Sequence, residues 1–327
     1  MTSVELFVLS GFLGSGKTTL LVDFLKTEHA GTTGVIVNEA GEIGVDGAIV
    51  ANDAGSPVTM MANGCVCCTL RDGLTDAVEA LLTAPRPGPT APLRRIIIET
   101  SGLSRPGPIL AALAGPEIAR WTPRAAVVTV YDAERGDTLG AQFEEAAAQF
   151  AGAQRIVASK VDAADAEALA LHGRRAHALS PLADIIVHRD RQERAAAAFA
   201  PLTTGGAQPR RWAETAVADP GVRHPRLQVY TGAAVRPLTW AEWSDWLDNL
   251  AGACGDRLLR LKAVIVASDY AEPILVQGVG TTFDAPRLLA PSAAETPALL
   301  MVTRDLGLET LDAMLPDSPV RLRFSRW

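Results

Sequence analysis

The stretch that decides the fold is "VELFVLSGFLGSGKTTLLVDFL", residues 4–25. Residues 4–9 form a continuous apolar run apart from Glu5, a pattern typical of a buried strand in a parallel sheet. The pattern G-x-x-x-x-G-K-T follows at Gly11–Thr18, and apolar residues then recur at helical spacing to residue 25. A glycine-rich turn between a strand and a helix predicts a phosphate-binding loop, where backbone N–H groups and the helix N-terminus hold phosphate oxygens.

Most residues of this loop are expected to contact a nucleotide, and two of them have specific roles. Lys17 is expected to reach the β- and γ-phosphates, and Thr18 is expected to ligate Mg²⁺. The residues expected to contact the nucleotide are Gly11, Gly14, Ser15, Gly16, Lys17, Thr18 and Thr19.

Two further strand ends bear polar residues. "RIIIETSG" (95–102) places Glu99 at the carboxyl end of an apolar strand, where open α/β sheets bind ligands. Glu99 could hold Mg²⁺ through water or position the attacking water. "IVASKVD" (156–162) follows another strand, and Asp162 could accept the two N–H groups on the Watson–Crick edge of guanine. With Lys160 over the base and Ser159 lining its pocket, the pattern favours GTP over ATP, which lacks the N1–H group.

Strand and helix patterns alternate over the first 200 residues, which predicts a mostly parallel sheet with helices on both faces. Gly, Pro and polar residues then dominate, and we expect a linker at 206–225 between domains at 1–205 and 226–327. The expected strands are 4–10, 33–38, 94–99, 124–131, 154–159 and 184–188, with helices at 17–29, 70–83, 107–114, 138–151 and 163–177. The smaller α+β domain is expected to contain strands at 226–231, 258–267, 273–283 and 297–303 and helices at 239–252 and 307–314.

Composition narrows the class of protein. The chain has 327 residues, a formal net charge of −7 and no long basic run, which argues against nucleic acid or an anionic membrane as partner. No window of about 18 uncharged apolar residues predicts a transmembrane helix. The N-terminus lacks a basic segment and a cleavage site for a signal peptide, so we expect a cytoplasmic protein.

Three of the four cysteines lie in "NGCVCC", residues 63–68. Cys67 and Cys68 are neighbours, and a disulfide between them would be strained. Thiolates suit Zn²⁺, Cu(I) and, with less preference, Co²⁺ or Ni²⁺, so Cys65, Cys67 and Cys68 are predicted metal ligands. Packing in a core and a redox switch remain the alternatives.

The motifs "GFLGSGKTT" (11–19), "NEAGEIGVD" (38–46), "NGCVCC" (63–68), "ETSG" (99–102) and "SKVD" (159–162) together resemble the CobW-type family of P-loop GTPases. "RLLRLKAVI" (257–265) and "ILVQGVGTTF" (274–283) resemble the family's C-terminal domain. The resemblance implies a slow GTPase that binds a transition metal and delivers it to a client metalloprotein. In the family, the base motif usually begins with Asn or Thr, whereas this chain has Ser159.

The resemblance also implies a larger set of metal ligands. "NEAGE" lies where the family's first nucleotide-sensing switch would be, and Glu39 and Glu42 are the candidate additional ligands. Zinc is the expected cargo, with cobalt or nickel as alternatives, while GTP and Mg²⁺ are the expected cofactors. A metal buffer or sensor regulated by nucleotide and a P-loop kinase for a small molecule remain alternative functions, and homo-oligomerisation remains open.

Overall fold

The computed structural model describes residues 4–27, 32–38, 58–60, 69–83, 92–121, 124–202, 226–290 and 298–325. Contacts divide the chain into two compact units. The first contains Met1–His177 and Ala183–Leu202, and the second contains Ala178–Leu182 and Thr203–Trp327. The predicted linker at 206–225 lies outside the described residues.

The first unit is built on a seven-stranded parallel sheet in the order β3-β2-β4-β1-β5-β6-β7. Its strands are β1 (Glu5–Ser10), β2 (Thr33–Asn38), β3 (Val58–Met60), β4 (Arg95–Thr100), β5 (Arg124–Asp132), β6 (Arg155–Ser159) and β7 (Asp184–Ile186). β1 lies between β4 and β5, so the loop after β1 is bordered by the carboxyl ends of both neighbours. Ligands bind at such a point in open α/β sheets.

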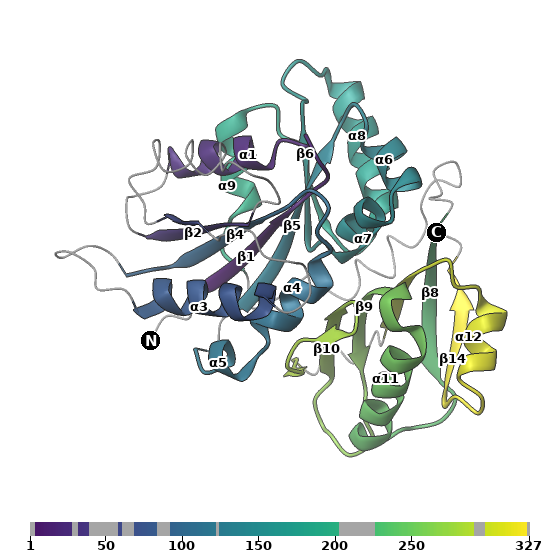
Figure 1. Cartoon of the computed structure of the whole chain (residues 1–327). Helices are drawn as coiled ribbons and strands as arrows, with labels where there is room; N and C mark the ends of the chain where they lie inside the picture. The colour runs from purple at the N-terminus through teal and green to yellow at the C-terminus, as the bar shows by residue number, and fades with distance from the viewer. Residues whose placement is uncertain are drawn as a thin grey trace. The chain divides into compact units, whose positions relative to one another are not determined.

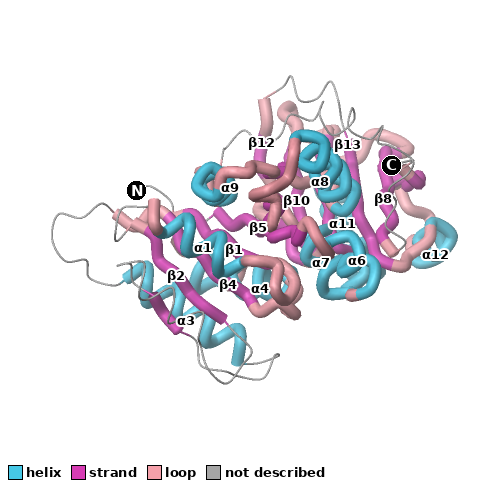
Figure 2. Tube along the Cα trace, turned by 90° about the horizontal axis from the view of Figure 1, so that it is seen from above, coloured by secondary structure: helices cyan, strands magenta, loops and turns pink. Residues whose placement is uncertain are grey.

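Helices cover both faces of this sheet (Figure 1). They are α1 (Lys17–Leu25), α3 (Thr69–Thr83), α4 (Pro106–Leu113), α5 (Pro116–Ala119), α6 (Gly136–Gln142), α7 (Glu144–Gly152), α8 (Ala166–Leu179) and α9 (Arg191–Ala198). Alternate residues of β1 enter different cores: Phe7 packs with α1 and α9, whereas Leu6 packs with α3, α4 and α5. Figure 2 shows α1 lying over β1 and β2. The predicted α/β architecture is confirmed.

The second unit contains an antiparallel sheet in the order β11-β10-β9-β13-β8-β14, with β12 paired to β10. Its elements are β8 (Leu227–Ala234), α11 (Trp240–Cys254), β9 (Leu258–Ile265), β10 (Ile274–Val279), β11 (Thr282–Phe283), β12 (Arg287–Leu288), β13 (Ala298–Arg304), α12 (Leu308–Met314) and β14 (Val320–Phe324). Trp243 and Trp246 of α11 lie in the core that this helix forms with the sheet. The predicted α+β class of this domain is confirmed.

Several predicted elements were wrong in detail. The helix expected at 138–151 is two helices, because Phe143 adopts an extended conformation (φ −116°, ψ 128°). Its ring packs on Phe12, with centroids 4.8 Å apart. The strand expected at 273–283 is a hairpin of β10 and β11, and Gly280 supplies the positive φ of 60° that the reversal requires. The elements β3, α5, α9, β12 and β14 were not predicted.

Candidate functional site

Glycine conformations shape the loop between β1 and α1. Gly11, Gly14 and Gly16 have φ of 141°, 71° and 94°, in the region that favours glycine. A Cβ on Gly11 would lie 2.8 Å from Ser15 Oγ and 2.9 Å from Val130 O. No side chain caps the start of α1 at Gly16. Its first N–H groups can therefore bind an anion, which is the property that a phosphate site needs.

Lys17 and Thr18 begin α1 beside this loop. Lys17 Nζ donates to Gly11 O at 2.9 Å, so the ammonium group lies over the turn that the glycines form. Thr18 Oγ1 donates to Glu99 Oε1 at 2.6 Å, and Glu99 is only 5% exposed at the end of β4. The structure thus brings together the three predicted catalytic residues. Thr19, also predicted to contact the nucleotide, is exposed in the first turn of the helix.

Gly102, which follows Glu99 in the ETSG motif, is packed directly against the phosphate loop. A Cβ at this position would lie 2.7 Å from Leu13 N and 2.9 Å from Leu13 Cα. Gln149 Nε2 donates to Gly102 O at 3.0 Å and to Ser104 O at 2.9 Å, which holds the segment after β4 in place. The position of the phosphate loop is therefore linked to that of Glu99 by backbone packing.

Asp132 is a central charge of the site that the sequence analysis missed. It ends β5, is 1% exposed, and accepts hydrogen bonds from Lys160 Nζ at 2.8 Å and Arg135 Nε at 3.1 Å. Burial would raise the pKa of the Asp132 carboxyl, but bonds from Lys160, Glu134 N–H and Arg135 outweigh it and hold that pKa below its ordinary value. The bond to Asp132 raises the pKa of Lys160, which remains a cation. Asp132 ends an apolar strand as Glu99 does, and that pattern could have revealed it.

The segment after β6 lies against the phosphate loop. Ser159 Oγ lies 2.7 Å from Ser15 O and donates to it, with Tyr131 O at 3.2 Å. Lys160 has a φ of 59°, an uncommon conformation for a residue with a side chain. With this backbone conformation, the Lys160 side chain pairs with Asp132 at 2.8 Å while remaining 34% exposed to solvent. The Ser159 hydroxyl group therefore connects this segment to the phosphate loop.

Asp162, the predicted base-reading carboxylate, lies at the surface with 57% of its side chain exposed. Arg194 Nη2 of α9 donates to Asp162 Oδ1 at 2.7 Å, and Arg194 Nη1 donates to His188 O at 3.0 Å. Arg194 was not predicted as a functional residue. It is one of two arginines in α9, a helix that was not predicted from the sequence, and no motif distinguishes it.

The predicted metal ligands Cys65, Cys67, Cys68, Glu39 and Glu42 all lie outside the described residues. Within the part of the chain that is described, no three His, Cys, Asp or Glu side chains are grouped as a metal site. The fourth cysteine, Cys254, is a buried free thiol in the second unit. Burial raises the pKa of the Cys254 thiol to about 11, with a smaller opposing effect of Arg257, so this group stays protonated at neutral pH.

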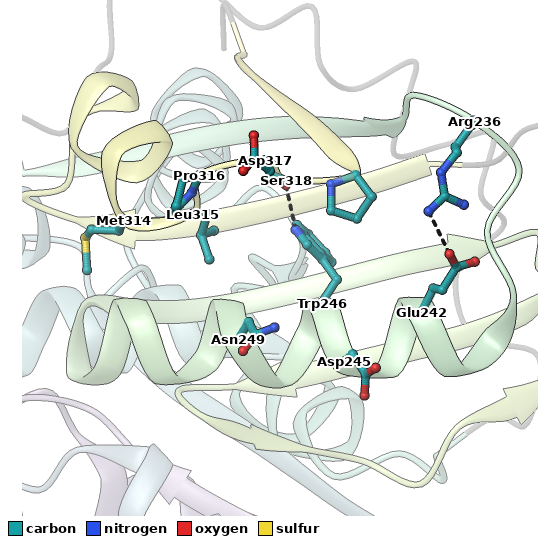
Figure 3. A pocket seen from close by; sticks show the side chains of 11 residues that line it. Arg236, Glu242, Asp245, Trp246, Asn249, Met314, Leu315, Pro316, Asp317 and Ser318 are labelled. Carbon is teal, nitrogen blue, oxygen red and sulfur yellow. Dashed lines mark hydrogen bonds and ion pairs between the residues drawn. The ribbon is translucent and has the colours of Figure 1, made fainter.

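A hollow of about 470 Å³ in the second unit lies between α11 and the segment after α12 (Figure 3). Trp246 donates from Nε1 to Ser318 Oγ at 2.9 Å at its base, and Arg236 pairs with Glu242 at its rim. It contains none of the predicted nucleotide or metal residues. Among the helices of the described segments, none has the length and apolar character needed to cross a membrane.

Comparisons with known proteins identify a family for each unit of the chain. Residues 5–187 match the family described as "CobW/HypB/UreG, nucleotide-binding domain", and residues 228–317 match "Cobalamin synthesis protein cobW C-terminal domain". The chain is 35% identical over 175 residues to the zinc chaperone YjiA of Escherichia coli, covering 53% of this chain and 54% of that protein. It is 33% identical over 200 residues to the zinc chaperone CobW of Pseudomonas aeruginosa, covering 52% of each.

The chain thus spans about half the length of the curated relatives that it matches. The crystal structure of Zn(II)-bound YjiA GTPase from E. coli is similar over 96% of this chain and 98% of that one. The TM-score is 0.63 and the sequence identity is 23%, so this similarity shows the fold.

Proposed function

Because the chain belongs to the CobW/HypB/UreG family of P-loop GTPases and has a CobW C-terminal domain, we propose that it is a GTP-hydrolysing metallochaperone. Its cargo would be a transition metal, with zinc as the first candidate, and its partner a client metalloprotein. The observation that supports the nucleotide chemistry best is the Thr18–Glu99 hydrogen bond of 2.6 Å beside the phosphate loop. The zinc chaperones among its relatives support the choice of cargo.

Thr18 and Glu99 have the donor groups that a magnesium ion prefers. Both offer hard oxygen atoms, and Glu99 is a buried carboxylate at the end of β4. Thr18 would bind Mg²⁺ directly, and Glu99 would bind it through water or orient the attacking water. When bound, Mg²⁺ would neutralise charge on the β- and γ-phosphates.

Lys17 would exchange its bond to Gly11 O for phosphate oxygens and so neutralise negative charge that develops during hydrolysis. Asp162 would select guanine, and Lys160, held by Asp132, would border the base. Because such GTPases depend on positioning and on charge that a partner can complete, we expect the intrinsic rate to be slow.

The proposed cargo site consists of Cys65, Cys67 and Cys68 with Glu39 or Glu42. Soft thiolates favour zinc, and cobalt or nickel would bind with less preference. A structural zinc site normally has four protein ligands, so three cysteines alone form an incomplete set, which suits a carrier that must release its metal. The fourth ligand would be a carboxylate from the nucleotide-sensing segment. We propose that the GTP state completes the site and that hydrolysis loosens it.

The experiment is a titration of Zn²⁺ against a competing chelator in the nucleotide-free, GDP and GTP-analogue states. We expect the Mg²⁺-bound GTP analogue to tighten zinc binding about 5–150-fold over Mg²⁺-GDP, the usual coupling between two linked sites. Zinc must then tighten binding of the GTP analogue by the same factor. Affinity should also rise with pH through the thiol range, because thiols lose protons to bind metal.

Cysteine variants provide matched controls. Replacing Cys67 and Cys68 by Ser should abolish tight zinc binding and leave metal-free GTP binding nearly unchanged. Cys254→Ser should retain tight zinc binding, because that thiol is buried and protonated in the other unit. Equal zinc affinity in all three nucleotide states would replace the proposal with a metal buffer or sensor. Transfer of the γ-phosphate to a molecule other than water would indicate a kinase.

A further inference from the structure

We propose that Arg194 is a positioning residue for base recognition, which holds the Asp162 carboxylate in the orientation that reads guanine. This inference rests on the proposed GTP site and adds to it a specificity-determining residue outside the sequence motifs. Arg194 would act through Asp162 without contacting the nucleotide itself.

The geometry places one buried guanidinium group between two loops at the same edge of the sheet. Arg194 is 7% exposed, and its two terminal nitrogens bond to groups from different loops. Nη2 donates to Asp162 Oδ1 at 2.7 Å in the loop after β6, and Nη1 donates to His188 O at 3.0 Å in the loop after β7. Because a guanidinium group is planar, the two bonds together fix the direction from which Asp162 is held.

Asp162 keeps the capacity to bind a base while Arg194 holds it. A carboxylate has about four lone-pair sites, and Arg194 occupies one of them on Oδ1. Within the described residues, no donor bonds to Oδ2, and the side chain is 57% exposed. A carboxylate that is anchored on its buried side and open on its exposed side can still accept the N1–H and N2–H groups of guanine.

Helix α9, which contains Arg194, is held in place by an N-terminal cap and by contacts with α1. Asp190 caps its N-terminus by accepting from Glu193 N at 2.8 Å. Arg191 bonds to both carboxylate oxygens of Asp23 in α1, at 2.8 and 3.1 Å. Apolar residues of α9 and α1 also share one buried core. The support for Asp162 is therefore connected to the helix that begins at the phosphate loop.

A simple structural role for Arg194 makes a different prediction from a positioning role. If Arg194 only stabilises the fold, its loss should weaken all nucleotides alike. If it positions Asp162, its loss should weaken guanine nucleotides selectively, because ADP makes no hydrogen bond to that carboxylate. The ratio of GDP affinity to ADP affinity separates the two roles, since phosphate contacts cancel in the ratio.

The experiment measures dissociation constants for GDP and ADP by calorimetry, in the full chain with Mg²⁺. Arg194→Gln should lower the GDP preference about tenfold, a coupling of ordinary size for residues in direct contact, with ADP affinity unchanged. Arg191→Gln is the matched control, because it removes an ion pair of the same helix that bonds to Asp23 and affects Asp162 only through a weaker charge interaction. It should therefore lower the preference much less than Arg194→Gln does. Arg194→Lys should restore part of the preference, since an ammonium group can still bond to Asp162.

Asp162→Asn provides a second test, which also serves if Arg194→Gln does not fold. In an Asp162→Asn background, Arg194→Lys should cause no further change in the GDP-to-ADP ratio, whereas in the parent it should lower that ratio measurably. An unchanged ratio in both Arg194 variants, or an equal loss in Arg191→Gln, would overturn the inference and leave guanine selection by Asp162 intact. A parent that binds GDP and ADP equally would overturn the guanine proposal as well.

Discussion

Gly102→Ala tests whether the ETSG segment and the phosphate loop are packed as tightly as the structure shows. The added Cβ would lie 2.7 Å from Leu13 N and 2.9 Å from Leu13 Cα, closer than real Cβ atoms approach backbone. The segment cannot easily retreat, because the fully buried Gln149 bonds to the carbonyl groups of Gly102 and Ser104. The phosphate loop must therefore shift at Leu13, beside Gly14.

The magnitude follows from the cost of overpacking. Forcing an extra methyl group into a packed site usually costs about 1–3 kcal/mol. For a domain of this size, about 1 kcal/mol lowers the unfolding midpoint by about 2–4 °C, so we expect a decrease of about 2–12 °C. Displacing the loop should also weaken GDP binding at least about tenfold, equivalent to about 1.4 kcal/mol.

The assay combines thermal unfolding without nucleotide and calorimetric titration with Mg²⁺-GDP. Gly173→Ala is the matched control, because its Cβ in helix α8 would approach only Val187, at 4.0 Å. Alanine is a better helix former than glycine by about 0.5–1 kcal/mol, so this variant should be as stable as the parent or more stable, with parental GDP affinity. Parental GDP affinity and an unchanged unfolding midpoint in Gly102→Ala would refute the argument.

Three further predictions concern charges and hydrogen bonds in the two units. Lys17→Ala should abolish GTP turnover and barely change the unfolding midpoint without nucleotide, so a parental rate of phosphate release would contradict its assigned role. Asp132→Asn should lower the free energy of unfolding at pH 7 by about 1–2 kcal/mol, a value reduced for solvent screening because Lys160 is 34% exposed. The folded pKa of Asp132 lies below its ordinary 3.8, so the difference in unfolding free energy between parent and variant should persist above about pH 4. It should shrink as the pH falls through the folded pKa. Urea titrations at several pH values would show this dependence. Trp246→Phe should cost about 1–2 kcal/mol in urea unfolding, because Ser318 loses the indole donor at 2.9 Å, and no measurable cost would contradict that bond's role.

The sequence predicted the main features of the fold because they depend on local patterns. Apolar runs between helical periods predicted the parallel sheet, and the glycines at 11, 14 and 16 predicted a turn that requires positive φ. The GKT motif and the strand ending at Glu99 similarly identified groups that the structure brings within hydrogen-bond distance. All strands of a parallel sheet end at the same edge, so the sequence could place Glu99 at the ligand-binding edge. That β4 lies directly beside β1 was decided by the tertiary structure.

The tertiary structure alone decided which other residues join them. Asp132 meets Lys160 because β5 pairs with β6, which places Asp132 opposite Ser159. Its place at the end of a strand can be read from the sequence, as for Glu99, but its pairing with a lysine 28 positions away cannot. The partnership of Arg194 with Asp162 joins residues 32 positions apart, through a helix whose alanine-rich sequence gave no functional signal. Burial and pairing depend on which segments pack together, and such long-range contacts cannot be derived from the propensities of either segment alone.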